Sequence, residues 1–215
     1  VIPHPDKKGW SGISLPWMAY GYGVLMTPMQ TLTFYNAIAN DGVMVRPRFI
    51  EGTQNTRSQI KKQSEVEIIN PSICSKETIG KVKSMLKGVV EKPWGTAHNI
   101  YDPNFAISGK TGTCQLDYNT EEVQYVASFV GYFPSDQPKY SCIVVIHRPD
   151  KEKGYFGNQV AAPVFQTIAH KLYSSIPRET KLSRDRYLEI TGNKNETNQS
   201  VVKVDVKLTK TQKKS

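Results

Sequence analysis

Long apolar runs are absent from this chain of 215 residues. No stretch of 18 apolar residues occurs, so the sequence predicts no membrane-spanning helix, and no secretory signal peptide is recognisable. The three cysteines, at positions 74, 114 and 142, lack Cys-x-x-Cys spacing, and the four histidines are scattered. Neither pattern predicts a metal site, and the odd cysteine count leaves the redox compartment open. Hydrophobic residues make up 38% of the chain, which is low for a well-cored domain and suits part of a larger one.

Basic residues exceed acidic ones, and the net charge is +9. Residues 174–215 carry ten Lys and Arg against five Asp and Glu, so this tail holds +5 of the charge. A tail rich in Lys, Thr and Asn predicts a basic, flexible, protease-sensitive extension after a domain that ends at residue 173. Anionic wall polymer or lipid headgroups are alternative partners for it. Nucleic-acid binding is not predicted, because no recognition motif accompanies the charge.

Residues 108–115 read Ser-Gly-Lys-Thr-Gly-Thr-Cys-Gln and follow a short apolar run that favours a strand. On a strand, alternate side chains share a face, so Lys110 and Gly112 lie on one face and Thr111 and Thr113 on the other. Gly112 allows a ligand backbone to lie close to the strand. An ammonium and two hydroxyls beside such a position suit an extended peptide that ends in a carboxylate.

A phosphate-binding P-loop is the competing interpretation of Gly-Lys-Thr. That motif requires a glycine at position 104, where this chain has Asn104, and a helix after the Thr. No helical pattern follows Thr113. A plain surface turn is the other alternative for the tetrapeptide alone. Lys-Thr-Gly is also the third motif of penicillin-binding proteins, but it indicates such a site only together with their other motifs.

Those other motifs are present in the expected order. They are Tyr20-Gly-Tyr-Gly followed by Thr27-Pro-Met-Gln, then Ala39-Asn-Asp-Gly, Val89-Val90, Gly95-Thr-Ala and finally Ser108-Gly-Lys-Thr-Gly-Thr with Gln115. This series resembles the C-terminal half of the transpeptidase domain of class B penicillin-binding proteins, the cell-division and elongation transpeptidases of bacteria. The resemblance covers about residues 10 to 173. It implies an α+β fold in which helices cover an antiparallel sheet, the penicillin-binding fold that is similar to that of serine β-lactamases.

The resemblance implies a site and a reaction. Lys110 and Thr113 would be catalytic, and Lys110, Thr111, Gly112 and Thr113 would bind the substrate. A serine would attack the D-Ala-D-Ala amide of a peptidoglycan stem peptide, and an amine from a second stem peptide would resolve the acyl-enzyme. β-Lactams would trap that intermediate. The backbone N–H of Thr113 would be one of two oxyanion donors. No metal or cofactor is implied.

The nucleophile is the part of the pattern that the chain does not supply. Ser-x-Asn, the second motif of the family, does not occur. Ser-x-x-Lys is matched at Ser58 to Lys61, in a polar stretch that we interpret as a loop, and at Ser84 to Lys87. Ser84 lies nearly opposite the apolar stripe of its helix and should face water. We interpret both as chance matches, so the chain is expected to be a fragment that is inactive alone.

The resemblance also implies partners and a location. The partners are stem peptides, β-lactams, the missing N-terminal half of the domain, and division or elongation proteins. The location is the extracytoplasmic face of the bacterial inner membrane, held by an N-terminal anchor that the chain lacks. A fragment of this fold would expose apolar surface that its other half covers. A penicillin-sensing receptor domain and a non-catalytic wall-binding module remain alternatives.

Periodicity and turn signals predict the elements. Thr27 to Gln30 forms a capping box for a helix that ends at Asn40-Asp41-Gly42, and Tyr20 to Gly23 forms a tight turn that packs two rings. The further predictions are short strands at 46–50 and 66–69 around a polar loop at 52–63, a helix at 76–91 with an Ile79, Val82, Leu86, Val89 stripe, strands at 105–113, 125–133 and 140–147, and a helix at 158–173 that buries Val160, Val164, Ile168 and Leu172. Pro163 should kink that helix or delay its start. Cys114 is expected to be a small buried hydrophobe, the 140–147 strand to be covered on both faces, and residues 201–208 to form a short strand.

Overall fold

The computed structural model of the chain describes residues 4–6, 8–54, 61–116 and 123–174. The chain divides into two units, Val1–His170 and Lys171–Ser215, and nearly all described residues belong to the first. The predicted basic extension and the predicted strand at 201–208 lie outside the described residues, apart from Ser174. Within the described part, no helix is long and apolar enough to cross a bilayer.

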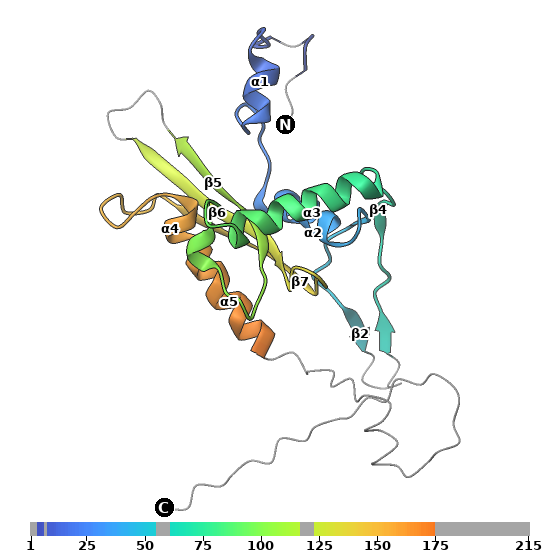
Figure 1. Ribbon diagram of the computed structural model, residues 1–215. Coiled ribbons are helices and arrows are strands. Elements are labelled where there is room, and N and C mark those ends of the chain that lie inside the picture. Colours follow the sequence, from blue (N-terminus) through green and yellow to red (C-terminus); the bar gives the residue numbers. More distant parts are fainter. Residues whose placement is uncertain (1–3, 7, 55–60, 117–122, 175–215) are drawn as a thin grey trace, which may run out of the picture. The chain divides into compact units, whose positions relative to one another are not determined.

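Three antiparallel strands form the central sheet, as the sequence predicted. They are β5 (Ser108–Leu116), β6 (Gln124–Phe133) and β7 (Tyr140–His147), in the order β5-β6-β7 (Figure 1). A turn at Pro134 to Pro138 joins the last two. The boundaries differ for β5, which starts three residues later than expected and continues three residues beyond Thr113. Strand β7 is mostly half-buried rather than covered on both faces, because it lies at the outer edge of the sheet.

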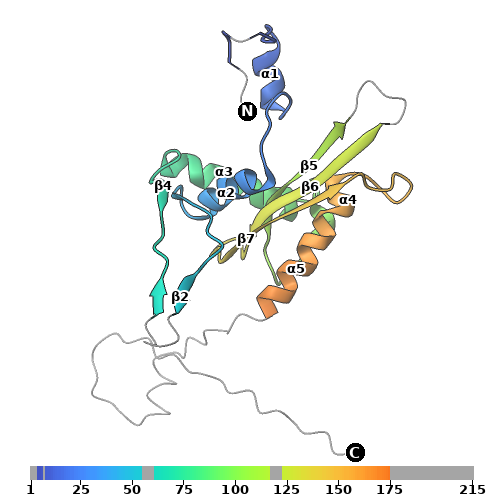
Figure 2. The same ribbon diagram turned by 180° about the vertical axis from the view of Figure 1, so that it is seen from behind.

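Helices pack on both faces of this sheet. In Figures 1 and 2 the strands run between α5 (Ala162–Ser174) on one side and α2 (Pro28–Ala39) with α3 (Lys76–Glu91) on the other. The larger core joins the sheet to α5 and to the 3-10 turn η1 (His98–Ile100), through Phe129, Phe133 and Phe165. The smaller core joins Tyr132 to α2 and α3, through Ile38 and Leu86. Phe129 and Tyr132 differ in parity along β6, so the two cores lie on opposite faces.

The two helices of the smaller core begin and end where the sequence predicted. Helix α2 (Pro28–Ala39) starts at a complete capping box, in which Thr27 Oγ1 accepts from Gln30 N–H and Gln30 Oε1 accepts from Thr27 N–H. Helix α3 (Lys76–Glu91) is capped by Ser75. Its buried residues, Ile79, Leu86 and Val90, follow the expected stripe closely, and Ser84 is exposed as expected.

The C-terminal helical segment corrects the predicted apolar stripe. It is two helices, α4 (Gly157–Val160) and α5 (Ala162–Ser174), with Pro163 at the second position of α5. The buried residues of α5 are Ala162, Phe165 and Ala169, whereas Val164 and Leu172 are 43% and 39% exposed. The hydrogen bonds from Ala161 N–H to Gly157 O and from Phe165 N–H to Ala161 O carry the helical pattern across the boundary between α4 and α5. The predicted stripe followed the large aliphatic side chains and was wrong because the buried face of α5 contains Phe165 and two alanines instead.

The described residues of 44–54 and 61–70 form two small antiparallel ribbons, whereas the sequence predicted two strands around a loop. Strand β1 (Met44–Val45) pairs with β4 (Ile68–Asn70), and β2 (Gly52–Gln54) pairs with β3 (Lys61–Gln63). The interpretation of 52–63 as a loop was wrong at both of its ends. Backbone hydrogen bonds stabilise these short ribbons. Their strands are too short and too polar to show the alternation of apolar residues from which a strand is predicted.

The N-terminal segment carries the short helix α1 (Ser14–Ala19) and the predicted glycine turn after it. Gly21 and Gly23 have φ of 94° and 72°, which favour glycine, so the turn is confirmed. Only one of its two tyrosines packs on a neighbour. Tyr22 lies 5.5 Å from the ring of Trp17, whereas Tyr20 is 85% exposed.

Candidate active site

The candidate site lies along β5, which is an edge strand. Among the described residues, β5 pairs with β6 and with no other strand. An antiparallel pair alternates between residues that exchange both backbone hydrogen bonds and residues whose N–H and C=O point away from the partner. The second kind of residue on β5 presents its backbone groups to the open edge of the sheet.

The close approach of Gly157 shows which residues of β5 are of each kind. A Cβ on Gly157 would lie 2.4 Å from Ser128 O and 2.6 Å from Gly112 O, although these two residues belong to different strands and face each other in the register. Two carbonyl oxygens that both approach one point lie between the strands. Gly112 and Ser128 are therefore a hydrogen-bonded pair. By alternation, Thr111 and Thr113 direct their N–H and C=O groups to the open edge.

The ammonium of Lys110 lies at this edge. The side chain is exposed, and Nζ donates to the carbonyl oxygen of Thr111 at 2.9 Å. Since that carbonyl points away from β6, the charge of Lys110 is held beside the outward backbone groups rather than over the middle of the sheet. A positive charge at an edge with free N–H donors favours an anionic ligand.

The hydroxyls of Thr113 and Thr111 project from the face opposite to Lys110, as the alternation predicted. Thr113 Oγ1 accepts the backbone N–H of Gly157 at 3.1 Å. Thr111 Oγ1 lies 3.1 Å from Thr96 Oγ1. Accepting one N–H does not use the hydroxyl's own proton, so Thr113 keeps a donor for a ligand. The edge of β5 thus combines an ammonium, a backbone N–H and hydroxyl donors.

Gly112 is surrounded more closely than the sequence suggested. A Cβ at this position would lie 2.5 Å from Ser128 Oγ, on the face that carries Lys110. The glycine therefore makes room for a neighbouring hydroxyl on β6.

Cys114, two residues further on, is exposed and not buried as expected. The smaller core packs on this face of the sheet around Tyr132, which pairs with Ser108. Cys114 pairs with Val126 near the other end of the two strands, so that core does not cover it.

One sequence match to a nucleophile motif lies in the described part of the chain. Ser84 is exposed on α3, and Ser58 lies outside the described residues. The sequence contains a third match, Ser200 to Lys203, which also lies outside the described residues. Strand β5 continues through the Gly-Lys-Thr run, which agrees with the rejection of a P-loop from the sequence. In the described ranges, no cluster of His, Cys, Asp or Glu is suited to a metal ion.

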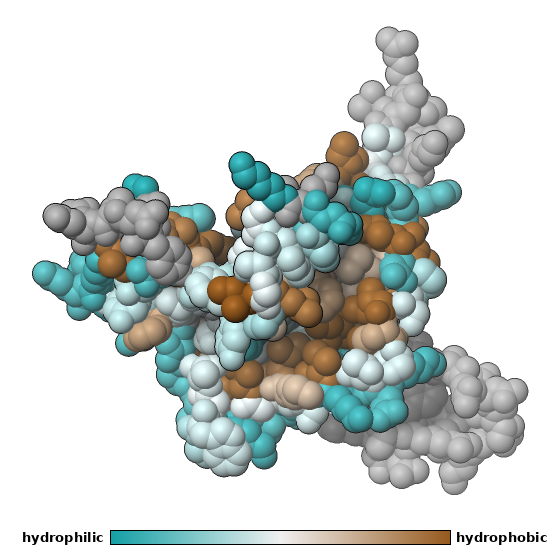
Figure 3. Space-filling model, turned by 90° about the horizontal axis from the view of Figure 1, so that it is seen from above, coloured by the Kyte–Doolittle hydropathy of each residue, from teal (hydrophilic) through white to brown (hydrophobic). Residues whose placement is uncertain are grey.

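The site is an open edge and not an enclosed cavity. Among the described residues, a cavity of about 290 Å³ is lined by Gln124 and Arg148, and another of about 260 Å³ is lined by Asn36 and Tyr140. Large apolar side chains are exposed on α2, α3 and the segment before them: Leu25, Met26, Met29, Phe34 and Met85. Figure 3 views the molecule from above and shows apolar surface gathered around a hollow. Exposed apolar surface of this kind marks a contact site.

Three comparisons with known proteins point in one direction. Residues 5–170 match the family model described as the penicillin binding protein transpeptidase domain. The peptidoglycan D,D-transpeptidase FtsI of Buchnera aphidicola is 31% identical over 173 residues, which are 80% of this chain and 28% of that protein. Stage V sporulation protein D of Bacillus subtilis is 32% identical over 154 residues, 70% of this chain and 23% of that protein. The chain thus spans less than a third of the length of these curated relatives.

Solved structures agree with the sequence comparisons. The apo form of penicillin binding protein 3 from Mycobacterium tuberculosis is 29% identical, with a TM-score of 0.69 over 82% of this chain and 41% of that one. The same protein has been solved in complexes with aztreonam and with ampicillin. These neighbours have the penicillin-binding fold, so the predicted combination of helices with an antiparallel sheet is confirmed.

Proposed function

Since the chain belongs to the family of penicillin-binding protein transpeptidase domains, we propose that it supplies the carboxylate-binding and oxyanion side of a serine acyl-transfer site. The supporting observation is the open edge of β5, where the outward N–H of Thr113 lies beside the ammonium of Lys110. The reaction proposed for the complete site is the cross-linking of peptidoglycan stem peptides. Its inhibitors are β-lactams, which relatives with this fold bind.

Each residue of the motif has a role in this proposal. Lys110 provides positive potential for the substrate's terminal carboxylate. Thr111 and Thr113 donate hydroxyl hydrogen bonds to that carboxylate, and Gly112 leaves the strand without a side chain that would collide with Ser128. The N–H of Thr113 stabilises the oxyanion of the tetrahedral intermediate. Removal of one such donor typically costs ~10²–10³ in rate.

The acyl-transfer steps need a serine that the described residues do not place here. Its oxygen attacks the carbonyl carbon of the D-Ala-D-Ala amide, the C–N bond breaks, and the terminal D-Ala leaves with the serine's proton. An amine of a second stem peptide then attacks the ester, and the serine regains its proton. We assign the reaction to the extracytoplasmic face of the membrane, with division or elongation proteins as partners.

Two alternatives use the same edge differently. A penicillin-sensing receptor domain would form the acyl-enzyme without turnover, and a wall-binding module would hold the stem peptide without chemistry. The coding sequence upstream of Val1 separates them. Ser-x-x-Lys together with Ser-x-Asn in that sequence supports an enzyme or a sensor, whereas their absence supports a binding module. Turnover of stem peptides then separates the enzyme from the sensor.

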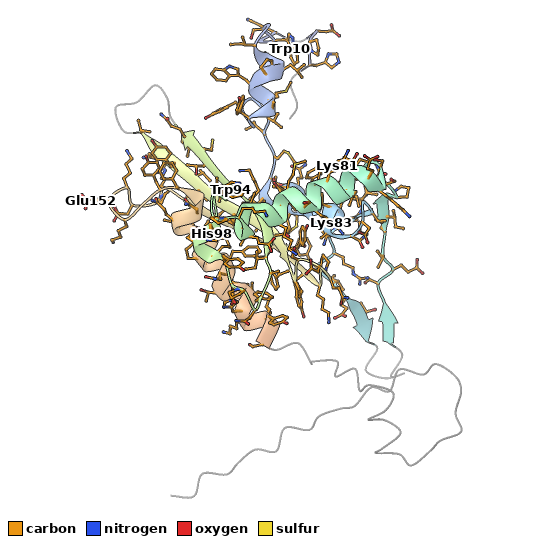
Figure 4. All side chains as sticks on the ribbon, viewed as in Figure 1. Trp10, Lys81, Lys83, Trp94, His98 and Glu152 are labelled. Atoms are coloured by element: carbon orange, nitrogen blue, oxygen red, sulfur yellow. The ribbon has the colours of Figure 1, made fainter. Side chains whose placement is uncertain are left out.

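Labelling by a fluorescent penicillin tests the proposal. The 215-residue chain alone should give no covalent band on denaturing electrophoresis. The product of the gene's complete reading frame should give one, and Lys110→Ala should weaken that band at least tenfold. Lys81→Ala is the matched control, because Lys81 is an exposed lysine on α3 that pairs with Glu77 and should not affect labelling (Figure 4).

Two results would contradict the proposal. One is equal labelling of the Lys110→Ala and Lys81→Ala proteins. The other is a band from the chain alone that disappears in Ser58→Ala, Ser84→Ala or Ser200→Ala, because the nucleophile would then lie within this chain.

A further inference from the structure

Thr96 lies beside the motif, on a turn fifteen residues before Thr111 in the sequence. The Gly95-Thr96-Ala97 turn follows α3, and Thr96 Oγ1 lies 3.1 Å from Thr111 Oγ1. Thr96 is exposed and Thr111 is half-buried, so both hydroxyls lie where the site meets solvent. The proposed function assigns no role to Thr96.

The turn holds Thr96 in one place. A Cβ on Gly95 would lie 2.3 Å from Val89 O, so the turn packs directly against the last turn of α3. Ala97 is fully buried, and its N–H donates to the same Val89 oxygen at 3.0 Å. The labelled neighbours Trp94 and His98 mark this place at the C-terminal end of α3 in Figure 4. The residue between two such anchors has little freedom to move its backbone.

The two hydroxyls together hold a spare proton. Each hydroxyl carries one proton, and the hydrogen bond between them uses only one of the two. When Thr96 donates to Thr111, the proton of Thr111 is directed away from Thr96 and remains available. An anion on Thr111 strengthens this order, because hydrogen bonds in a chain polarise one another.

We propose that Thr96 is a positioning residue for the carboxylate of the ligand. It donates to Thr111 Oγ1, fixes the Thr111 rotamer, and thereby directs the Thr111 proton to the carboxylate. The identity of the ligand rests on the proposed function. The pairing of Thr96 with Thr111 rests on their observed contact alone.

Titration of the chain with acetyl-D-Ala-D-Ala and with its C-terminal amide, followed by NMR, tests the inference. The wild-type chain should bind the carboxylate more tightly than the amide. Thr96→Val keeps the side-chain shape and should weaken carboxylate binding about 3–10-fold, the value of one hydrogen bond, with little change for the amide. Thr96→Ser should stay within about twofold of the wild type. Thr167→Val, which removes an exposed hydroxyl bonded within α5, is the matched control.

Two further measurements separate positioning from a purely structural role. Three-bond couplings of Thr111 should report one χ1 rotamer in the wild type and an average of rotamers in Thr96→Val. Thr96→Val and Thr111→Val should be non-additive in carboxylate binding, because both remove the same relay. Thr96→Val binding at wild-type affinity, or unchanged Thr111 couplings, would overturn the inference and leave the proposed function intact. A wild-type chain without preference for the carboxylate would overturn both.

Discussion

Gly157 is the position at which a single methyl group should displace the candidate site. A Cβ there would lie 2.4 Å from Ser128 O, 2.6 Å from Gly112 O and 3.2 Å from Gly112 N, whereas ordinary contact is 3.4–4 Å. All three atoms are backbone atoms of a central sheet, so they have no rotamer into which to move. Gly157→Ala should therefore push α4 away from β5 by about 1 Å.

The cost follows from two terms. Overpacking of a close contact costs about 1–3 kcal/mol. The bond from Gly157 N–H to Thr113 Oγ1, now 3.1 Å, would stretch beyond hydrogen-bonding range and lose about 1 kcal/mol more. The free energy of unfolding should fall by about 2–4 kcal/mol. The Thr113 hydroxyl would also lose the partner that orients it.

Urea unfolding followed by circular dichroism measures this change, and NMR of Thr113 reports its hydroxyl contact. The control is Gly80→Ala, since Gly80 lies in α3 with no atom within 4 Å of a new Cβ. That substitution should raise the free energy of unfolding by about 0.5–1 kcal/mol, because alanine favours a helix. If both variants are equally stable, α4 does not rest on β5 at Gly157 and the assigned hydrogen-bonding register is wrong.

Three further outcomes test the packing around the site. Phe165→Ala should lower the free energy of unfolding by about 3–5 kcal/mol in urea, since this fully buried ring joins α5 to the sheet; a loss below 1 kcal/mol would remove it from the core. Iodoacetamide should modify exposed Cys114 well before Cys142, because burial raises the pKa of the Cys142 thiol; mass spectrometry after timed quenching shows the order, and the reverse order would refute it. The hydrogen bond to Asp136 raises the pKa of Lys87, so their pair should contribute stability at neutral pH that is lost as pH rises through that raised pKa, above 10.5. Urea midpoints should fall more steeply at high pH in the wild type than in Lys87→Met, and parallel curves would show that the pair contributes nothing.

Local signals in the sequence predicted the elements whose boundaries are set by neighbouring residues. Thr27 and Gln30 specify the start of α2 within four residues, and the stripe of α3 lies within one helix. The predicted stripe of α5 was wrong because two of its buried residues are alanines, which a search for large aliphatic side chains passes over. The pairing of β2 with β3 failed because polar strands held by backbone bonds carry no alternation that a sequence can show.

The site divides in the same way. Alternation along 110–113 predicted that Lys110 and Thr111 lie on opposite faces, and the contacts of both residues agree. The packing of Gly157 on the strand and the contact of Thr96 with Thr111 join residues 15 to 44 positions apart. Such contacts depend on how helices dock on the sheet. In the sequence, the motif Gly95-Thr96-Ala97 indicated a turn that belongs to the family pattern. It did not indicate that Thr96 contacts Thr111.

Amide hydrogen exchange along β5 tests the central claim, that this strand presents an unpaired Thr113 N–H at an open edge. Exchange should alternate along the strand, with slow exchange at Lys110 and Gly112 and fast exchange at Thr111 and Thr113. Addition of acetyl-D-Ala-D-Ala should slow exchange at Thr113 and leave Gly112 unchanged. Exchange at Thr113 as slow as at Gly112 in the free chain would show that another strand already binds this N–H, and it would contradict the oxyanion role.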